Sequence, residues 1–234
     1  MIHGFTQNSR TWGRFADLLA ADFEVVLVDA PGHGQSEHDH ADLDEAGDLI
    51  IEAGGEAHYL GYSMGGRMML HGALGHNAAV RSLTLIGSTA GLEDESERSD
   101  RRHADEALAD RLIAEGLDSF LDWWLDLALF STLSVESAYL EKRRENRPDG
   151  LAASLRRCGA GTQQSLWNRL GELMMPTLLV AGSEDSKFSA VGRRMADQIH
   201  DAQFTTADGG HAIHSEKPDD VAALVREFVR SVEQ

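Results

Sequence analysis

The pattern Gly61-x-Ser63-x-Gly65 constrains the fold of this chain more than any other feature. A short apolar run at residues 57–60 comes directly before it, and good helix formers at residues 67–74 follow it. Small residues around a serine permit the strained strand-to-helix turn known as a nucleophile elbow. The five-residue pattern alone occurs by chance in many proteins, but its strand and helix flanks favour an elbow with Ser63 at the tip.

Short apolar runs alternate with helical patterns along most of the chain, which is typical of a parallel sheet covered by helices on both faces. Besides the run before Ser63, strands are expected at 23–28, 82–86, 177–181 and 203–206. Helices are expected at 190–199 and 218–232, the second with Pro218 in its first turn.

The alternation stops between residues 91 and 170, where three helical segments are expected at 93–110, 120–130 and 134–157. The sequence therefore predicts the α/β class with a mostly parallel sheet flanked by helices. Residues 1–90 and 171–234 are expected to form the core, and residues 91–170 an inserted helical cap. A chain of 234 residues with 42% apolar content is long enough for such an arrangement.

Charge and cysteine content exclude several classes of function. The formal net charge of 21 − 39 = −18 repels a phosphate backbone, so no nucleic-acid partner is expected. Cys158 is the single cysteine, so neither a disulfide nor a cysteine-based metal site is expected. Lysine is rare beside arginine, which leaves anion binding to arginine forks or reflects codon usage alone. The sequence does not distinguish a monomer from a homo-oligomer.

No apolar run approaches the length of a membrane span. The start, Met1-Ile2-His3-Gly4, has neither the charged residues nor the apolar core of a signal peptide. We therefore expect a cytoplasmic protein without a membrane partner.

A serine becomes a useful nucleophile or base only when an imidazole takes its proton and a carboxylate orients that imidazole. Asp185 follows the strand expected at 177–181, at the sheet edge where ligand sites of parallel sheets lie, and is the predicted acid. Glu184 is the rival. His211 lies in a glycine-containing loop before the last helix and is the predicted base, with His214 as its rival.

A developing oxyanion needs two backbone donors. Met64, directly after the serine, supplies one N–H group, and Phe5 in the His3-Gly4-Phe5 loop supplies the other.

At these residues the chain resembles the α/β-hydrolase superfamily, and within it the family of 2-succinyl-6-hydroxy-2,4-cyclohexadiene-1-carboxylate synthases (MenH). The resemblance covers nearly the whole chain. It is carried by the following stretches: His3-Gly4-Phe5-Thr6, Gly61-Tyr62-Ser63-Met64-Gly65-Gly66-Arg67, residues 98–109, Phe120-Leu121-Asp122-Trp123-Trp124, residues 150–156, Gln164-Ser165-Leu166-Trp167 and Asp185-Ser186-Lys187-Phe188.

The resemblance implies a carbon–oxygen lyase of menaquinone biosynthesis that eliminates pyruvate from a cyclohexene polycarboxylate, with the serine as a base and with no cofactor. By position in the family's motifs, it also implies carboxylate-binding arginines and two pocket walls: Arg67, Arg101 and Arg143, with Tyr62 and Trp124. Arg101 and Arg143 each have an adjacent arginine, so solvated or paired side chains are the alternative for these two. Trp124 could instead be part of the cap core.

Two departures from the family pattern leave a rival open. The chain begins almost at the oxyanion loop, whereas the general fold has strands before it; an incorrect start, a shortened chain or a reduced sheet would each account for this. The charge of −18 also opposes the approach of a polyanion. The rival is a serine hydrolase acting on a small ester, a thioester or a carbon–carbon bond. A non-catalytic receptor on the same fold is a further alternative, although such a protein need not keep the whole triad.

Overall fold

A four-stranded parallel sheet organises the computed structural model, which describes residues 1–36 and 40–234. The strands lie side by side in chain order: β1 (Ala57–Tyr62), β2 (Val80–Ile86), β3 (Thr177–Gly182) and β4 (Ala202–Ala207). The expected α/β class with a parallel sheet is therefore confirmed, and the strands expected after residue 56 are found within one or two residues of their predicted ends.

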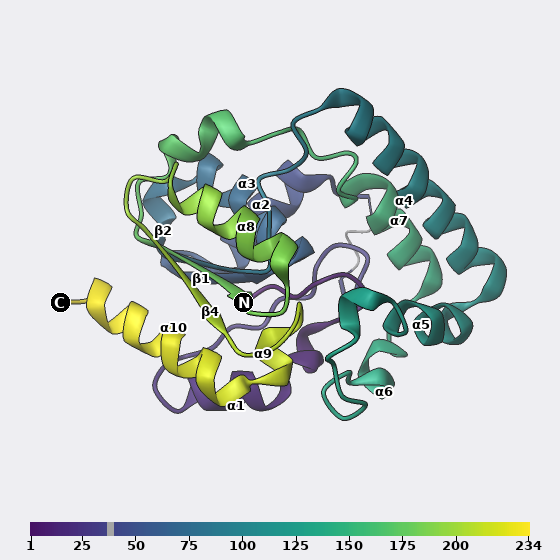
Figure 1. Ribbon diagram of the computed structural model, residues 1–234, viewed down its shortest axis with the longest axis horizontal. Coiled ribbons are helices and arrows are strands. Elements are labelled where there is room, and N and C mark those ends of the chain that lie inside the picture. Colours follow the sequence, from purple (N-terminus) through teal and green to yellow (C-terminus); the bar gives the residue numbers. More distant parts are fainter. Residues whose placement is uncertain (37–39) are drawn as a thin grey trace.

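Helices cover both faces of this sheet (Figure 1). One face carries α2 (Leu43–Gly54), α3 (Met64–Gly75) and α8 (Ser186–Ala196), and the other carries α1 (Gly13–Ala20) and α10 (Pro218–Val232). The short elements η1 (Ser9–Trp12), η2 (Asn77–Ala79), η4 (Trp167–Glu172) and α9 (Ile213–Glu216) connect them. Among the residues that the structure describes, no helix combines the length and the apolar character needed to cross a membrane.

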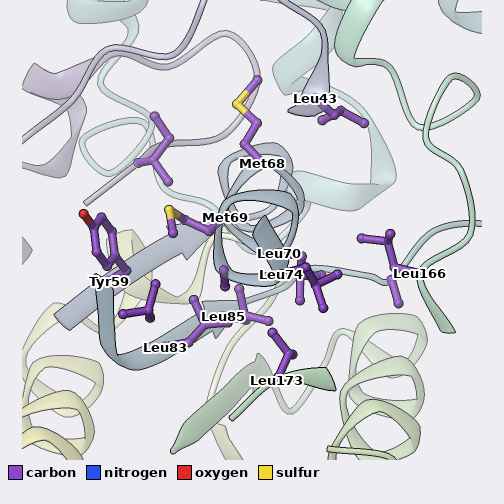
Figure 2. Packing of buried hydrophobic residues seen from close by; sticks show 14 of the residues in the cluster. Leu43, Tyr59, Met68, Met69, Leu70, Leu74, Leu83, Leu85, Leu166 and Leu173 are labelled. Atoms are coloured by element: carbon purple, nitrogen blue, oxygen red, sulfur yellow. The ribbon is translucent and has the colours of Figure 1, made fainter. Parts of the chain in front are cut away.

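The largest of three hydrophobic clusters in the described chain lies between α3 and the sheet (Figure 2). Met68, Met69 and Leu70 of α3 are fully buried, and Leu83 and Leu85 of β2 face the same cluster. Burial of side chains of this size contributes about 1.5–3 kcal/mol each to folding. The helix that follows the elbow is therefore packed tightly, which holds Ser63 at a fixed height above the sheet.

Residues 91–170 carry helices beside the carboxyl ends of the strands (Figure 1). These are α4 (Glu95–Glu115), α5 (Leu117–Leu125), η3 (Ala128–Phe130), α6 (Leu140–Arg143) and α7 (Pro148–Cys158). The single helical segment expected at 134–157 is wrong: α6 and α7 are separated because Pro148 disfavours a helical residue before it, and Arg147 is extended at φ −100° and ψ 134°.

The strand expected at residues 23–28 is also wrong. Val28 forms only an isolated parallel bridge with Ile2, which bridges Gly61 of β1 on its other side. Met1 and Ile2 are the residues that run beside this segment, and the chain then turns into the loop at Gly4. Two residues of pairing do not make a continuous ladder.

Candidate active site

The elbow around Ser63 is strained and closely packed. Ser63 has φ 51° and ψ −110°, an unusual backbone conformation for a residue other than glycine, and its N–H donates to Ile86 O at 2.8 Å. A Cβ at Gly61 would lie 2.6 Å from the Cα of Gly66, and one at Gly65 would lie 2.4 Å from His3 O. The glycines of the pattern are thus required by close backbone approaches on both sides of the serine.

Three loops bring a serine, an imidazole and a carboxylate together at the carboxyl edge of the sheet. Ser63 follows β1, Asp185 follows β3, and His211 follows β4, and parallel strands end at the same edge. His211 Nε2 lies 3.1 Å from Ser63 Oγ, and His211 Nδ1 lies 2.7 Å from Asp185 Oδ2. The remaining oxygen of Asp185 accepts from Phe188 N at 3.1 Å, which caps α8. This geometry makes Ser63 able to give its proton to His211.

Neither rival residue lies at the triad. Glu184 is exposed, while its neighbour Asp185 is 9% exposed and contacts His211. His214 is buried among the rings of Trp12 and Tyr62, and neither of its ring nitrogens has a hydrogen-bond partner in the described chain. Burial lowers the pKa of His214 to about 3, so this ring is neutral near pH 7.

The loop before α1 presents a backbone donor beside the elbow. The Gly4 carbonyl accepts from Gln7 N at 3.2 Å and lies 2.9 Å from His3 Nδ1. His3 Nε2 accepts from Ala30 N at 3.1 Å, so Nδ1 carries the proton and donates to Gly4 O. Because a trans peptide is planar, the Phe5 N–H points away from the Gly4 carbonyl. Met64 begins α3, so its N–H has no intrahelical acceptor and adds a second donor.

A cavity of about 570 Å³ opens above Ser63 and His211. Its wall includes every residue that the sequence singled out around the serine, except Asp185: Phe5, Tyr62, Met64, Arg67, Arg101, Trp124 and Arg143. Core and cap elements therefore share one chamber. Within the described parts of the chain, no group of three His, Cys, Asp or Glu side chains is arranged to hold a metal ion.

Arg67 is a buried cation in the wall of this cavity. It lies on the first turn of α3, is 8% exposed, and its Nη1 has no hydrogen-bond partner among the described residues. Burial, with a smaller contribution from the nearby charge of Arg101, lowers the pKa of Arg67 to about 10, which still leaves the side chain charged at neutral pH. A buried guanidinium with a free N–H group is suited to an anionic ligand.

The two cap arginines differ from Arg67 because each already has partners. Arg101 Nε donates to Asp105 Oδ1 at 2.8 Å, one helical turn away, so it is paired as the alternative interpretation allowed. Arg143 is 2% exposed, donates from Nε to Ala138 O at 2.7 Å and from Nη1 to Thr6 Oγ1. Arg143 thus joins the cap to the loop that carries Phe5.

Tyr62 at the end of β1 and Trp124 on α5 line the same cavity. The Tyr62 ring lies 5.4 Å from His211, and burial raises its pKa above the usual range. Trp124 lies edge-on to Phe5 at 5.2 Å and stacks with Phe120 at 5.9 Å, so it belongs to the cap core and to the cavity wall at once. Its Nε1 has no partner in the described chain.

Sequence reasoning missed a second set of charged residues in the wall. Lys187 and Arg194 of α8 border the cavity together with Glu93, which precedes α4. The sequence held a signal for Lys187 and Arg194. They are seven positions apart, so they lie on one face of the helix that follows the predicted acid, Asp185.

Comparisons with known proteins find relatives that match nearly the whole chain. The family described as "Alpha/beta hydrolase family" matches residues 1–224. A protein of Pectobacterium atrosepticum named 2-succinyl-6-hydroxy-2,4-cyclohexadiene-1-carboxylate synthase is 31% identical, over 97% of this chain and 92% of its own length. A Bacillus subtilis protein provisionally named for the same activity is 32% identical, over 99% of this chain and 89% of its own length.

Among solved structures, that of MenH from S. aureus is similar along the entire chain. The TM-score is 0.93 at 31% identity, with 100% of this chain and 93% of the other covered. The likeness therefore includes the cap segments and not the sheet alone.

Proposed function

The chain belongs to the α/β-hydrolase family, and from this premise we propose that it is a carbon–oxygen lyase. The proposed reaction eliminates pyruvate from 2-succinyl-5-enolpyruvyl-6-hydroxy-3-cyclohexene-1-carboxylate and gives 2-succinyl-6-hydroxy-2,4-cyclohexadiene-1-carboxylate, a step of menaquinone biosynthesis. The proposed partner is therefore a small polycarboxylate. Relatives that are about 31% identical over most of the chain carry the name of this activity.

One observation carries the proposal: a buried guanidinium with an unpartnered N–H group lies in the wall of the same cavity as a complete triad. Arg67 Nη1 has no acceptor among the described residues, while Ser63 and His211 line the same cavity. An enzyme for neutral esters gains nothing from a buried charge, whose desolvation is costly. A substrate carboxylate would supply the missing partner.

The triad geometry suits proton abstraction next to a carbonyl. His211 takes the Ser63 proton, and the serine oxygen removes a proton from the carbon beside the ketone of the substrate. Negative charge then develops on the ketone oxygen, where the N–H groups of Phe5 and Met64 stabilise it. The electron pair then forms a ring double bond between carbons 2 and 3, the existing double bond shifts to carbons 4 and 5, and the bond from carbon 5 to oxygen breaks. The leaving enolate takes the proton held by His211 and becomes pyruvate. Binding of the substrate carboxylates would hold the reacting carbon beside the Ser63 oxygen, which lowers the entropic part of the barrier.

The test is pyruvate release from the proposed substrate by the purified chain, measured against the spontaneous rate. We expect fast release by the wild type and its loss in both Ser63→Ala and Arg67→Ala. Release no faster than background in the wild type contradicts the proposal.

The same triad also suits attack on an ester carbonyl, so a panel of small esters is the matched control. Ester hydrolysis that survives Arg67→Ala but not Ser63→Ala would assign the chain to serine hydrolases instead, because a neutral ester has no carboxylate for Arg67 to bind. If the chain is a lyase, we expect pyruvate release to be lost in Arg67→Ala as well as in Ser63→Ala.

A further inference from the structure

The rim of the cavity holds an ion pair that joins the cap to the core. Arg194 Nη1 donates to Glu93 Oε2 at 2.5 Å and Nη2 donates to Glu93 Oε1 at 3.0 Å. Arg194 lies on α8, and Glu93 lies just before α4, and both side chains border the cavity above Ser63. The pair therefore lies in the cavity wall with both side chains half exposed to solvent.

The two partners of this pair are fixed unequally. The Arg194 guanidinium carbon lies 3.9 Å from the centre of the Trp167 ring, and the Trp167 indole N–H donates to Gly91 O at 2.9 Å. Trp167 is 7% exposed, so the surface under the guanidinium is rigid. No comparable contact holds the Glu93 carboxylate in the described chain. Rotation of the Glu93 side chain would leave Arg194 in place, stacked and facing the cavity.

Exchange of the anion at Arg194 is energetically easy. The two side chains are 50% and 51% exposed, and ion pairs in such surroundings contribute little to stability. A carboxylate of the substrate that replaced Glu93 would keep the number of ion pairs constant. Because Arg194 is held by Trp167 and Glu93 is not, the arginine is suited to bind an anion, and Glu93 is the anion bound to it in the free protein.

We propose that Arg194 is a specificity-determining residue that binds a carboxylate of the incoming substrate, and that Glu93 competes for it as a built-in occupant of the site. This inference rests on the proposed function insofar as it requires a polycarboxylate substrate. It explains how a chain with a net charge of −18 selects a polyanion at the rim. Only a ligand with a carboxylate at the correct position displaces Glu93, whereas a neutral ligand leaves the ion pair closed.

The test compares Glu93→Gln, Arg194→Gln and the double variant in the pyruvate-release assay. We expect Glu93→Gln to lower the KM about two- to fivefold, because a competitor is removed, and Arg194→Gln to raise the KM by a similar factor. The kcat should stay within about twofold in both, since neither side chain belongs to the triad or hydrogen-bonds to it. The double variant should match Arg194→Gln, because Glu93 acts only through the arginine.

The matched control is the ion pair of Arg14 with Asp219, which joins α1 to α10 away from the cavity. It is also doubly hydrogen-bonded, at 2.9 and 2.6 Å, and its side chains are 62% and 59% exposed. Asp219→Asn removes the same single negative charge as Glu93→Gln, so a KM change caused by net charge alone appears in both. Equal effects in these two variants would overturn the proposal.

A binding arm separates this inference from the proposed reaction. The probe is tricarballylate, a compact tricarboxylate, titrated calorimetrically into each variant. Tighter binding by Glu93→Gln and weaker binding by Arg194→Gln support the proposal even if the wild type releases no pyruvate. Weaker binding in both variants shows that the pair only braces the cap, and unchanged binding in both shows that Arg194 does not meet the ligand; either result overturns the proposal.

Discussion

Polar side chains at the carboxyl edge of the sheet have hydrogen-bond partners within the protein, whereas one in the cavity wall above it has an N–H group that lacks a partner in the described chain. At the edge, Ser63, His211 and Asp185 satisfy one another within 3.1 Å. In the wall, Arg67 keeps Nη1 unpartnered within the described chain, although the side chain is buried. A satisfied network is stable without a ligand, while an orphaned cation costs stability until an anion arrives. The difference indicates which groups are ready for chemistry and which wait for the substrate.

The wall itself contains both kinds of arginine. Arg143 donates to Ala138 O and to Thr6 Oγ1, so it contributes to the structure of the oxyanion loop, whereas Arg67 contributes little to any contact within the protein. Replacing each in turn should therefore separate activity from stability.

The largest effect is expected at the triad. Asp185→Asn removes the charge that orients His211 and should reduce pyruvate release by about 10³-fold or more. The adjacent Glu184→Gln is the control and should leave the rate unchanged, because Glu184 is exposed. Steady-state kinetics measure both, and a comparable loss in the two variants would contradict the assignment of the acid.

Arg67→Met should lower kcat/KM for pyruvate release by about 10²-fold, since a hydrogen-bonded charge pair with the substrate is lost. The same substitution should leave the Tm unchanged or raise it by a few degrees, because a buried unpaired charge is replaced by an apolar side chain of similar length. Kinetics and thermal unfolding are measured on the same sample. A Tm that falls steeply would show that Arg67 is structural.

Arg143→Met should show the reverse balance. Loss of its two buried hydrogen bonds is expected to cost about 3 kcal/mol, which corresponds to a Tm about 9 °C lower in a domain of this size. Arg143→Lys serves as the control for charge, since it keeps the cation without the fork. If the Tm of Arg143→Met equals that of the wild type, the proposed link between the cap and the oxyanion loop is wrong.

The smallest expected effect is on the pH dependence of stability and comes from His214. His211 has a hydrogen-bond partner at both ring nitrogens, whereas His214 has none at either within the described chain. Burial lowers the pKa of His214 from its ordinary value of 6.5 to about 3. The unfolded chain therefore takes up a proton between these pH values that the folded chain does not, so stability falls as the pH drops through this range. At pH 5 this one group lowers stability by about 2 kcal/mol relative to pH 7.5.

His214→Phe should remove the contribution of His214 to the loss of unfolding free energy between pH 7.5 and pH 5. Urea unfolding at pH 7.5 and pH 5 is expected to show a smaller difference in the variant than in the wild type. An equal difference in both proteins would show that His214 does not drive the acid sensitivity.

Much of the site was accessible from local patterns because its residues occupy stereotyped positions. The elbow needs glycines at Gly61 and Gly65 for close backbone contacts, and the predicted acid and base follow strands that can be recognised by their apolar runs. Family membership and the fold class were predicted on this basis and are confirmed.

Other features depended on contacts that the sequence does not encode locally. The expected strand at 23–28 failed because an apolar run becomes a strand only with a partner of sufficient length, and Ile2 provides a single bridge. The spacing of Lys187 and Arg194 could be read from the sequence, but the pairing of Arg194 with Glu93 and its stacking on Trp167 could not, because these partners come from distant parts of the chain.

By itself, the sequence determined the α/β class, the expected triad residues and the loop of Phe5, since each follows from short-range requirements of turns, strand ends and helix starts. The use of the three arginines depends on contacts that form only in the folded chain. Arg67, Arg101 and Arg143 look alike in the sequence, yet one is unpartnered, one is paired with Asp105 and one holds two segments together. The free energy of a buried charge depends on the partners that the folded chain brings to it, and those partners lie far away in the sequence.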